Sequence, residues 1–298
     1  ETEKISAFVV ETDWPGVQVE YRCHFMGLKA LANAVISFKN VRVPRENLIG
    51  EPGKGLKIAL TTLNEGRLSI PNAAVGVAKI CLQICLKWGN ERIQWGKPIG
   101  KHEAIAHMIS QMAATTFAME SLICSATDLS DKNTFDIRLE AAAAKEWNTC
   151  RGWEIIDNTM QIRGGRGYEK EASLGARGED ALGVERMMRD FRINKIFEGS
   201  SEIMHLFMAR EALEKHLQIA GKLVNPNSSL GSKLKALPDF LSFYVWWYPT
   251  RWIGWSCWPR YKNFGDLSPH LRFINRKSRK LARQVFHGML VYGSSLQN

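Results

Sequence analysis

The stretch that decides the fold reads Val77-Ala78-Lys79-Ile80-Cys81-Leu82-Gln83-Ile84-Cys85-Leu86-Lys87-Trp88. Its apolar side chains recur at i, i+3, i+4, i+7, i+8 and i+11, so they form one stripe along a helix. A second stripe begins within residues 105–112, and a third helical region spans 136–162. With a fourth region further on, long helices joined by modest connections predict a mainly α protein, an antiparallel four-helix bundle over residues 51–216.

Residues before the bundle have the pattern of short strands. Residues 5–10, 17–21 and 34–38 are β-prone runs, and Asp13-Trp14-Pro15-Gly16 is a turn between the first two. Three short strands cannot enclose a core of their own. The family resemblance described below implies that residues 1–50 are the remnant of a truncated β-domain, the C-terminal part of its middle domain. We also expect the chain to be N-terminally incomplete, since it enters strand sequence directly from Glu1.

The composition excludes several classes of protein. The chain has 298 residues, 45% of them hydrophobic, which suits one large or two smaller globular domains. No uninterrupted apolar run approaches the roughly 18 residues of a membrane span. None of the six cysteines forms a Cys-x-x-Cys pair. Cys81 and Cys85 share one helix face without an accompanying histidine cluster, so buried thiols are expected in place of a metal site.

The C-terminal part differs from the rest in composition. Residues 217–238 are rich in Gly, Asn and Ser and predict a linker, and residues 239–298 predict a partial, aromatic and basic helical extension. From Arg251 onward there are nine Lys or Arg and a single acid, Asp266, within a net charge of +10. Five of the ten tryptophans lie close together: Trp246, Trp247, Trp252, Trp255 and Trp258. Such sequence fits contact with a membrane surface, or an aromatic core packed inside the extension, and the two are compatible.

Glu198 lies at the break in the fourth helical region, between an aromatic residue and a glycine. The segment reads Ile196-Phe197-Glu198-Gly199-Ser200-Ser201-Glu202-Ile203. A carboxylate in an apolar niche can serve as a base near neutral pH, which the abstraction of hydrogen from carbon requires. The same letters also suit a plain helix boundary with Ser200 or Ser201 as N-cap.

Two more motifs precede this segment. They are Asn90-Glu91-Arg92-Ile93-Gln94-Trp95-Gly96-Lys97-Pro98-Ile99 and Gln161-Ile162-Arg163-Gly164-Gly165-Arg166-Gly167-Tyr168. In this order, separated by amphipathic helices, the three resemble the acyl-CoA dehydrogenase family of flavoproteins over roughly residues 1–215. The segment Asn64-Glu65-Gly66-Arg67 and the long C-terminal extension are similar to the very-long-chain, membrane-associated branch.

The resemblance implies α,β-dehydrogenation of acyl-CoA thioesters in fatty acid β-oxidation, with FAD as cofactor and an electron-transfer flavoprotein as acceptor. It implies Glu198 as the base that takes the α proton, with its backbone N–H and a flavin hydroxyl polarising the thioester carbonyl. In other branches the base comes from the place of Gly66, which cannot serve. Gly199 would let the backbone pass close to the acyl chain.

The resemblance also assigns binding residues. Cofactor contacts fall on Arg92, Gln94, Trp95, Gln161, Gly165, Ser200 and Glu202. Those of Arg92, Gln161 and Gly165 would reach the FAD of a neighbouring subunit, which implies a homodimer. Substrate contacts fall on Asn64, Glu65, Gly66, Arg67 and Gly199. No metal is expected.

Alternative functions on the same scaffold stay open. One is a non-catalytic flavoprotein, either DNA-associated or an assembly factor for a membrane complex. Another is an acyl-CoA oxidase. The aromatic residues beside the basic tail favour lipid, so nucleic acid is not expected as a partner. The expected location is the cytoplasm with peripheral membrane association in a bacterium, or the matrix side of the mitochondrial inner membrane in a eukaryote.

Overall fold

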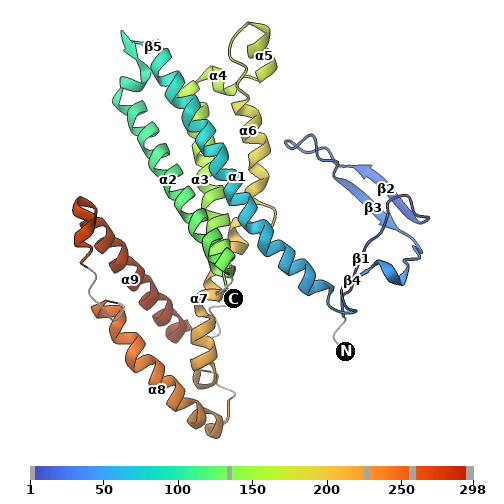
Figure 1. Ribbon diagram of the computed structural model, residues 1–298, viewed down its shortest axis with the longest axis vertical. Coiled ribbons are helices and arrows are strands. Elements are labelled where there is room, and N and C mark those ends of the chain that lie inside the picture. Colours follow the sequence, from blue (N-terminus) through green and yellow to red (C-terminus); the bar gives the residue numbers. More distant parts are fainter. Residues whose placement is uncertain (1–3, 133–135, 225–227, 255–259, 293–298) are drawn as a thin grey trace. The chain divides into compact units, whose positions relative to one another are not determined.

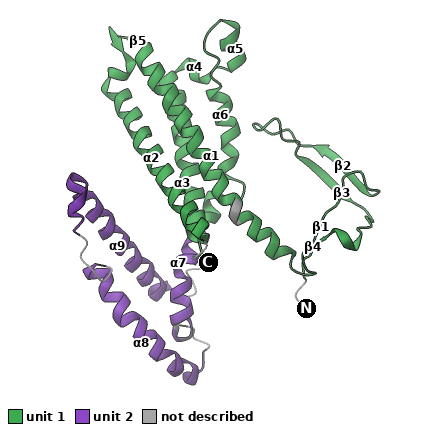
Figure 2. Ribbon diagram, viewed as in Figure 1, with its two compact units in different colours: residues 1–205 green, residues 206–298 purple. Residues whose placement is uncertain are grey.

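The computed structural model describes residues 4–132, 136–224, 228–254 and 260–292. The chain divides into two compact units, residues 1–205 and 206–298 (Figure 2). Each unit is mainly helical, as Figure 1 shows, and small β elements occur only in the first among the described residues. The predicted fold class, mainly α with a β remnant, is confirmed.

The β elements of unit 1 lie before the long helices. Strands β2 (Val17–Arg22) and β3 (Ala34–Phe38) pair antiparallel, and so do β1 (Ala7–Phe8) and β4 (Leu48–Ile49). Apolar side chains on these strands are open to solvent, with Phe38 61% exposed. The described strands therefore bury little apolar surface of their own, as their shortness predicts.

Three long helices build the core of unit 1: α1 (Gly55–Glu91), α2 (Glu103–Lys132) and α3 (Arg138–Arg163). Helix α1 packs along both α2 and α3. Of the predicted stripe on α1, Cys81 and Cys85 are in the core and Val77 and Trp88 pack against it, whereas Ile80 is 46% exposed. The other buried residues of this core include Ala74, Ala78, Met112, Met119, Ile123, Ala126, Ala144, Ile155 and Ile156. Both thiols of the stripe are buried, as expected.

Among the described residues α1 is also the one helix long and apolar enough to cross a membrane, with a mean hydropathy of 1.5 over its best window. Its side chains Ala74, Ala78 and Cys81 have no exposed surface and belong to the core. Pro71 lies inside this helix, and its carbonyl accepts a hydrogen bond from Asn148 Nδ2 on α3.

After α3 the chain passes through short elements. These are α4 (Gly165–Tyr168), α5 (Glu171–Ala176), α6 (Val184–Phe191) and the 3-10 turn η3 (Arg192–Lys195). The charged loop around α5 is held by ion pairs within itself and to neighbouring helices: Arg166–Glu179, Arg177–Glu169, Arg186–Glu171 and Lys87–Asp180. Helix α7 (Ser201–Val224) then begins in unit 1 and continues into unit 2.

Unit 2 also contains α8 (Leu230–Ile253), the 3-10 segment η4 (Lys262–Leu267) and α9 (Ser268–Tyr292). An aromatic cluster forms its core: Leu213, Ala220, Tyr244, Phe286 and Met289, with Phe240, Phe243, Trp247 and Tyr248 packed against them. His216 is buried in this cluster, and its Nδ1 is 2.7 Å from the hydroxyl oxygen of Tyr244. Unit 2 thus has a core of its own, to which α7 contributes Leu213 and Ala220.

The predicted linker at residues 217–238 is mostly helical, so that prediction was wrong for the described residues. Helix α7 continues to Val224, and α8 begins at Leu230 with Ser229 as its N-cap. The serines that looked like linker sequence start a helix, since the Ser229 hydroxyl accepts from the N–H of Ser232. Residues 225–227, Trp255, Cys257 and Trp258 lie outside the described residues.

Candidate active site

The backbone at Glu198 and Gly199 is unusual. The 3-10 turn η3 ends at Lys195, and α7 begins at Ser201. Between them Glu198 has φ +52° and Gly199 has φ +94°. A side chain at position 199 would also collide with the terminal methyl of Met204, so this place requires glycine. For Glu198 the left-handed conformation costs roughly 1–2 kcal/mol, which the surroundings must offset.

The side chain of Glu198 lies against Gly66 of α1. A Cβ built on Gly66 would be 2.8 Å from Glu198 Oε2 and 3.2 Å from its Cδ. Oε2 is buried and accepts no hydrogen bond from the described part of the chain. The glycine at 66 therefore provides the space that the carboxylate occupies, and one carboxylate oxygen is held without a donor.

A buried lysine on α3 contacts the backbone of this turn. Lys145 of α3 has no exposed surface, and its ammonium donates a hydrogen bond to the carbonyl oxygen of Gly199. Burial lowers the pKa of Lys145, and the charge of Glu198 opposes that shift. The sequence analysis missed Lys145. The signal was present, since this lysine follows the alanine run 141–144 on the buried face of α3.

The predicted substrate segment lies on α1. Arg67 is half-buried and is close enough to Lys145 to lower the pKa of that lysine slightly. Asn64 and Glu65 are part of the same helix, but their side chains lie outside what the structure describes. The proposed substrate contacts of these residues stay predictions.

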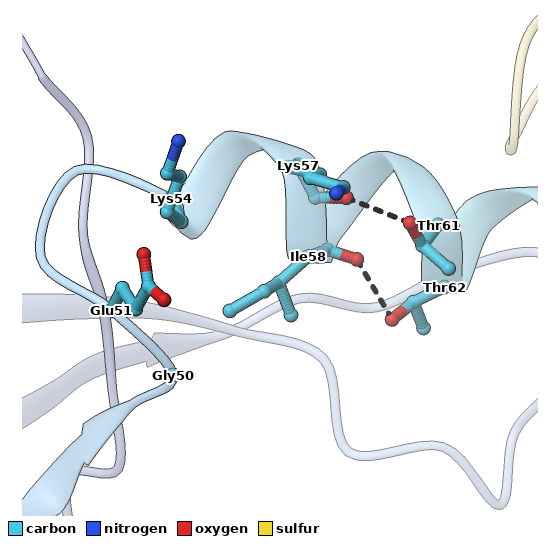
Figure 3. A pocket seen from close by; sticks show the side chains of 7 residues that line it. All are labelled: Gly50, Glu51, Lys54, Lys57, Ile58, Thr61 and Thr62. Carbon is cyan, nitrogen blue, oxygen red and sulfur yellow. Dashed lines mark hydrogen bonds between the residues drawn. The ribbon is translucent and has the colours of Figure 1, made fainter.

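A pocket that the sequence did not predict opens at the start of α1, with a volume of about 410 Å³. Figure 3 shows its lining: Gly50, Glu51, Lys54, Lys57, Ile58, Thr61 and Thr62. The hydroxyls of Thr61 and Thr62 donate to the carbonyls of Lys57 and Ile58 one turn earlier (Figure 3). Ile58 and Thr62 precede Gly66 by eight and four residues, so all three share one face of α1.

The other predicted cofactor residues gather at the far end of the bundle. Residues Arg92, Gln94, Trp95 and Gly165 line one cavity of about 440 Å³, whereas Gln161 lies just outside its lining. The cavity is formed by the end of α1, the β5–β6 hairpin and the turn between α3 and α4, and Figure 1 shows β5 and α4 at that end.

The chemistry of this cavity suits an anionic, aromatic group such as a dinucleotide. Two further arginines, Arg163 and Arg166, line it, and their guanidinium carbons lie 4.9 and 5.7 Å from the centroid of the Trp88 ring. No carboxylate is among the described lining residues. A Cβ on Gly164 or Gly165 would meet nothing within 4 Å, which leaves open space at the turn. Planar guanidinium groups and an open glycine turn fit a pyrophosphate.

Trp95 occupies the tip of the hairpin formed by β5 (Ile93–Gln94) and β6 (Lys97–Pro98). Its φ is +48° and that of Gly96 is +75°, so the turn is of the tight hairpin type. The ring is 89% exposed and meets His102 edge-on at a centroid distance of 5.4 Å. An exposed aromatic ring is compatible with a contact to the FAD of a second subunit. The contact of Trp95 with FAD stays a prediction.

Ser200 and Glu202 have local roles in the structure. The Ser200 hydroxyl accepts from the N–H of Ile203 at 3.4 Å, so Ser200 is the N-cap of α7, as the simpler interpretation of the segment held. Hydrogen bonds from its own backbone N–H and from Ser200 lower the pKa of Glu202, which is exposed. Their proposed contacts with the FAD pyrophosphate stay predictions.

The structure separates the predicted site residues into two groups. Lys145, behind Glu198, and Gly164, at the cavity, are 19 residues apart on and just after α3, which is roughly 28 Å at 1.5 Å per residue. One chain therefore brings together Glu198, Gly66 and Gly199 at one place and Arg92, Gln94, Trp95 and Gly165 at another.

Comparison with known proteins identifies the family of the helical region. Residues 53–213, more than half of the chain, match the family model "Acyl-CoA dehydrogenase, C-terminal domain". The chain is 52% identical over 294 residues to "Probable acyl-CoA dehydrogenase FadE10" of Mycobacterium tuberculosis, covering 98% of this chain and 45% of that protein. It is 34% identical over 234 residues to the human "Very long-chain specific acyl-CoA dehydrogenase, mitochondrial", covering 78% of this chain and 33% of that protein.

A solved structure is similar over nearly the whole chain. The acyl-CoA dehydrogenase of Bacillus anthracis complexed with FAD has a TM-score of 0.73 at 27% identity, over 98% of this chain and 47% of that one. The chain spans less than half the length of these relatives. The match of the helical region, together with the predicted motifs, shows that the chain belongs to the acyl-CoA dehydrogenase family.

Proposed function

We propose that the protein catalyses FAD-dependent α,β-dehydrogenation of long-chain acyl-CoA thioesters and passes the electrons to an electron-transfer flavoprotein. The observation that carries this proposal is the Glu198 carboxylate in its left-handed turn, with Gly66 leaving room beside it. One of its oxygens is buried and accepts no hydrogen bond from the residues that the structure describes. A base must be within reach of the proton it takes and must not be occupied by another donor.

In this mechanism Glu198 takes the α proton of the thioester and becomes a carboxylic acid. Bound FAD would supply the oxidising chemistry by accepting the β hydrogen as hydride. Gly199 allows the strained turn that carries the base, where a side chain would meet Met204, and Gly66 keeps α1 clear of the carboxylate. The face of α1 that carries Ile58, Thr62 and Gly66 gives a substrate a continuous line from the pocket of Figure 3 to Glu198.

Most of the residues that would hold the cofactor line the cavity at the far end of α3. The pyrophosphate and adenosine end would be held by Arg92, Gln94, Trp95 and Gly165. Gln161 is not among the lining residues of that cavity. Because Glu198 is at the other end of α3, the residues of two subunits would complete one site. This separation supports a homodimer.

The experiment is anaerobic titration of the FAD-loaded protein with palmitoyl-CoA and with octanoyl-CoA, followed by mass spectrometry of the product. The expected result is bleaching of the flavin and loss of two hydrogens from the acyl chain, with palmitoyl-CoA acting at lower concentration. In air, an acceptor-dependent rate without peroxide distinguishes a dehydrogenase from an oxidase. Yellow protein that neither substrate bleaches would refute the proposal.

We further propose that residues 239–298 contact a membrane surface. In unit 2, Trp247 packs into the core, whereas Trp246 and Trp252 are 68% and 55% exposed. Beside Trp252 the face of α9 forms a basic groove: Phe273, Arg276, Lys277, Arg279, Lys280 and Arg283. Exposed indole rings next to cations suit the headgroup level of an anionic bilayer.

Flotation with phosphatidylglycerol vesicles tests this contact, with phosphatidylcholine vesicles as the neutral comparison. Replacing Arg276 and Lys280 with Gln should reduce co-flotation, because each well-placed charge contributes about 1 kcal/mol at an anionic surface. The matched control replaces Lys233 and Lys235 of α8, which lie outside the groove. Equal flotation of both double variants would contradict the assignment, and a salt-sensitive DNA shift without flotation would favour nucleic acid instead.

A further inference from the structure

Lys145 is an exception among the lysines whose burial the structure describes. It lies in α3 with no exposed surface, one turn after the buried Ala141 and Ala142. Lysines are almost never fully buried unless they are paired, since removing an ammonium from water is costly. A helix of this composition would bury a methionine at this place more favourably. The lysine therefore needs a reason in what it touches.

Its hydrogen-bonding partner is the turn that carries the base. The Lys145 ammonium donates to the carbonyl oxygen of Gly199, directly after Glu198. Glu198 and Gly199 are consecutive residues with positive φ, and the former pays for this conformation because it has a Cβ. A donor fixed on α3 holds the peptide that follows Glu198 and so limits the directions in which its side chain can leave the backbone.

The charges around Lys145 come from two helices and the turn. Glu198 faces it from the turn, Arg67 from α1, and Glu146 and Cys150 from α3. Glu146 is already engaged, because its Oε1 accepts from the Cys150 thiol and lies 3.1 Å from His205 Nε2. Among the groups that favour the charged form of Lys145, Glu198 has the largest effect.

We propose that Lys145 is a positioning residue for the base: its ammonium fixes the Glu198–Gly199 turn through the Gly199 carbonyl. This inference rests on the proposed function. It adds that the geometry of the base is set from α3, a helix that carries none of the residues assigned to the substrate.

The test compares Lys145→Met, which removes both the bond and the charge, with Lys145→Gln, which keeps a donor and removes the charge. Lys79→Met is the control, an exposed lysine of α1 that pairs with Glu120. The assays are the reductive half-reaction with palmitoyl-CoA, the KM for palmitoyl-CoA, FAD content and Tm.

We expect Lys145→Met to lower kcat roughly 100-fold with KM changed by less than about threefold, since the loss falls on the positioned base. Lys145→Gln should recover part of kcat. A purely structural lysine would instead lower FAD content and Tm without this split between kcat and KM. Lys79→Met should match the parent in every assay.

Two results would overturn the proposal. One is a Lys145→Gln enzyme whose kcat per bound flavin is no higher than that of Lys145→Met. The other is a loss confined to FAD content and Tm, with unchanged kcat per bound flavin. If Lys145→Met does not fold, the second result, measured on Lys145→Gln, decides. Failure of the proposed function is distinguishable, because the parent protein itself would then leave its flavin oxidised with palmitoyl-CoA.

Discussion

The contact between Gly66 and Glu198 makes Gly66→Ala an informative substitution. The added methyl would be 2.8 Å from Glu198 Oε2, whereas ordinary contacts of a Cβ begin near 3.4 Å. The carboxylate must therefore move by roughly 0.5 Å or rotate away. It is the end of a flexible side chain, so the fold tolerates the change, and alanine favours a helix over glycine by about 1 kcal/mol.

We expect Gly66→Ala to lower the catalytic rate without lowering the stability of the protein. The Tm should stay equal or rise slightly, and the FAD content should not change. The rate of flavin reduction by palmitoyl-CoA should fall about 10- to 100-fold. A misplacement of about 1 Å can cost two orders of magnitude, and the carboxylate moves by roughly half of that or rotates away. Stopped-flow absorbance gives the rate, and differential scanning fluorimetry gives the Tm.

Gly76→Ala is the matched control on the same helix, because a Cβ on Gly76 meets nothing within 4 Å. It should keep the parent's rate. Full activity in Gly66→Ala, or an equal loss in both variants, would refute the reasoning that position 66 provides the space for the base.

Three further predictions concern other parts of the chain. Gly199→Ala should lower both Tm and activity, because φ is +94° and the methyl collides with Met204; a variant as stable as the parent would contradict the strained turn. Arg92→Gln should reduce the FAD retained on gel filtration, while flavin that remains bound is still reduced; unchanged retention would remove Arg92 from the cofactor site. Burial lowers the pKa of His216 below its usual 6.5, so unit 2 should be fully stable above that pH and lose stability as pH falls below it; thermal melts between pH 5 and 8 should show this slope, and His216→Phe should abolish it.

The long helices could be predicted from the sequence, whereas the segment that joins two of them could not. The stripe from Val77 to Trp88 and the region 136–162 became α1 and α3, because a long apolar stripe at helical spacing has few alternatives. The linker prediction at 217–238 failed because serine and asparagine are equally typical of loops and of helix N-caps, and only the hydrogen bond of Ser229 decides between them.

For the site, the motifs indicated the residue types but not their partners. That Glu198 faces Gly66 depends on how the turn between η3 and α7 lies against α1, which no local pattern encodes. Lys145, Arg163 and Thr62 were missed for the same reason: each is an ordinary helix residue in sequence, and its role follows from what another element brings to it. The resemblance implied that Arg92, Gln161 and Gly165 serve the FAD of a neighbouring subunit, and the length of α3 keeps Gly165 far from Glu198 within one chain.

The central claim is that Glu198 takes the α proton. The most direct measurement is the single-turnover rate of flavin reduction when the FAD-loaded protein is mixed anaerobically with palmitoyl-CoA, in the parent, in Glu198→Gln and in Glu120→Gln. The last replaces a half-exposed acid on α2. We predict a rate at least about 10³-fold lower for Glu198→Gln alone, with its FAD still bound. A Glu198→Gln protein that is reduced as fast as the parent would contradict the account.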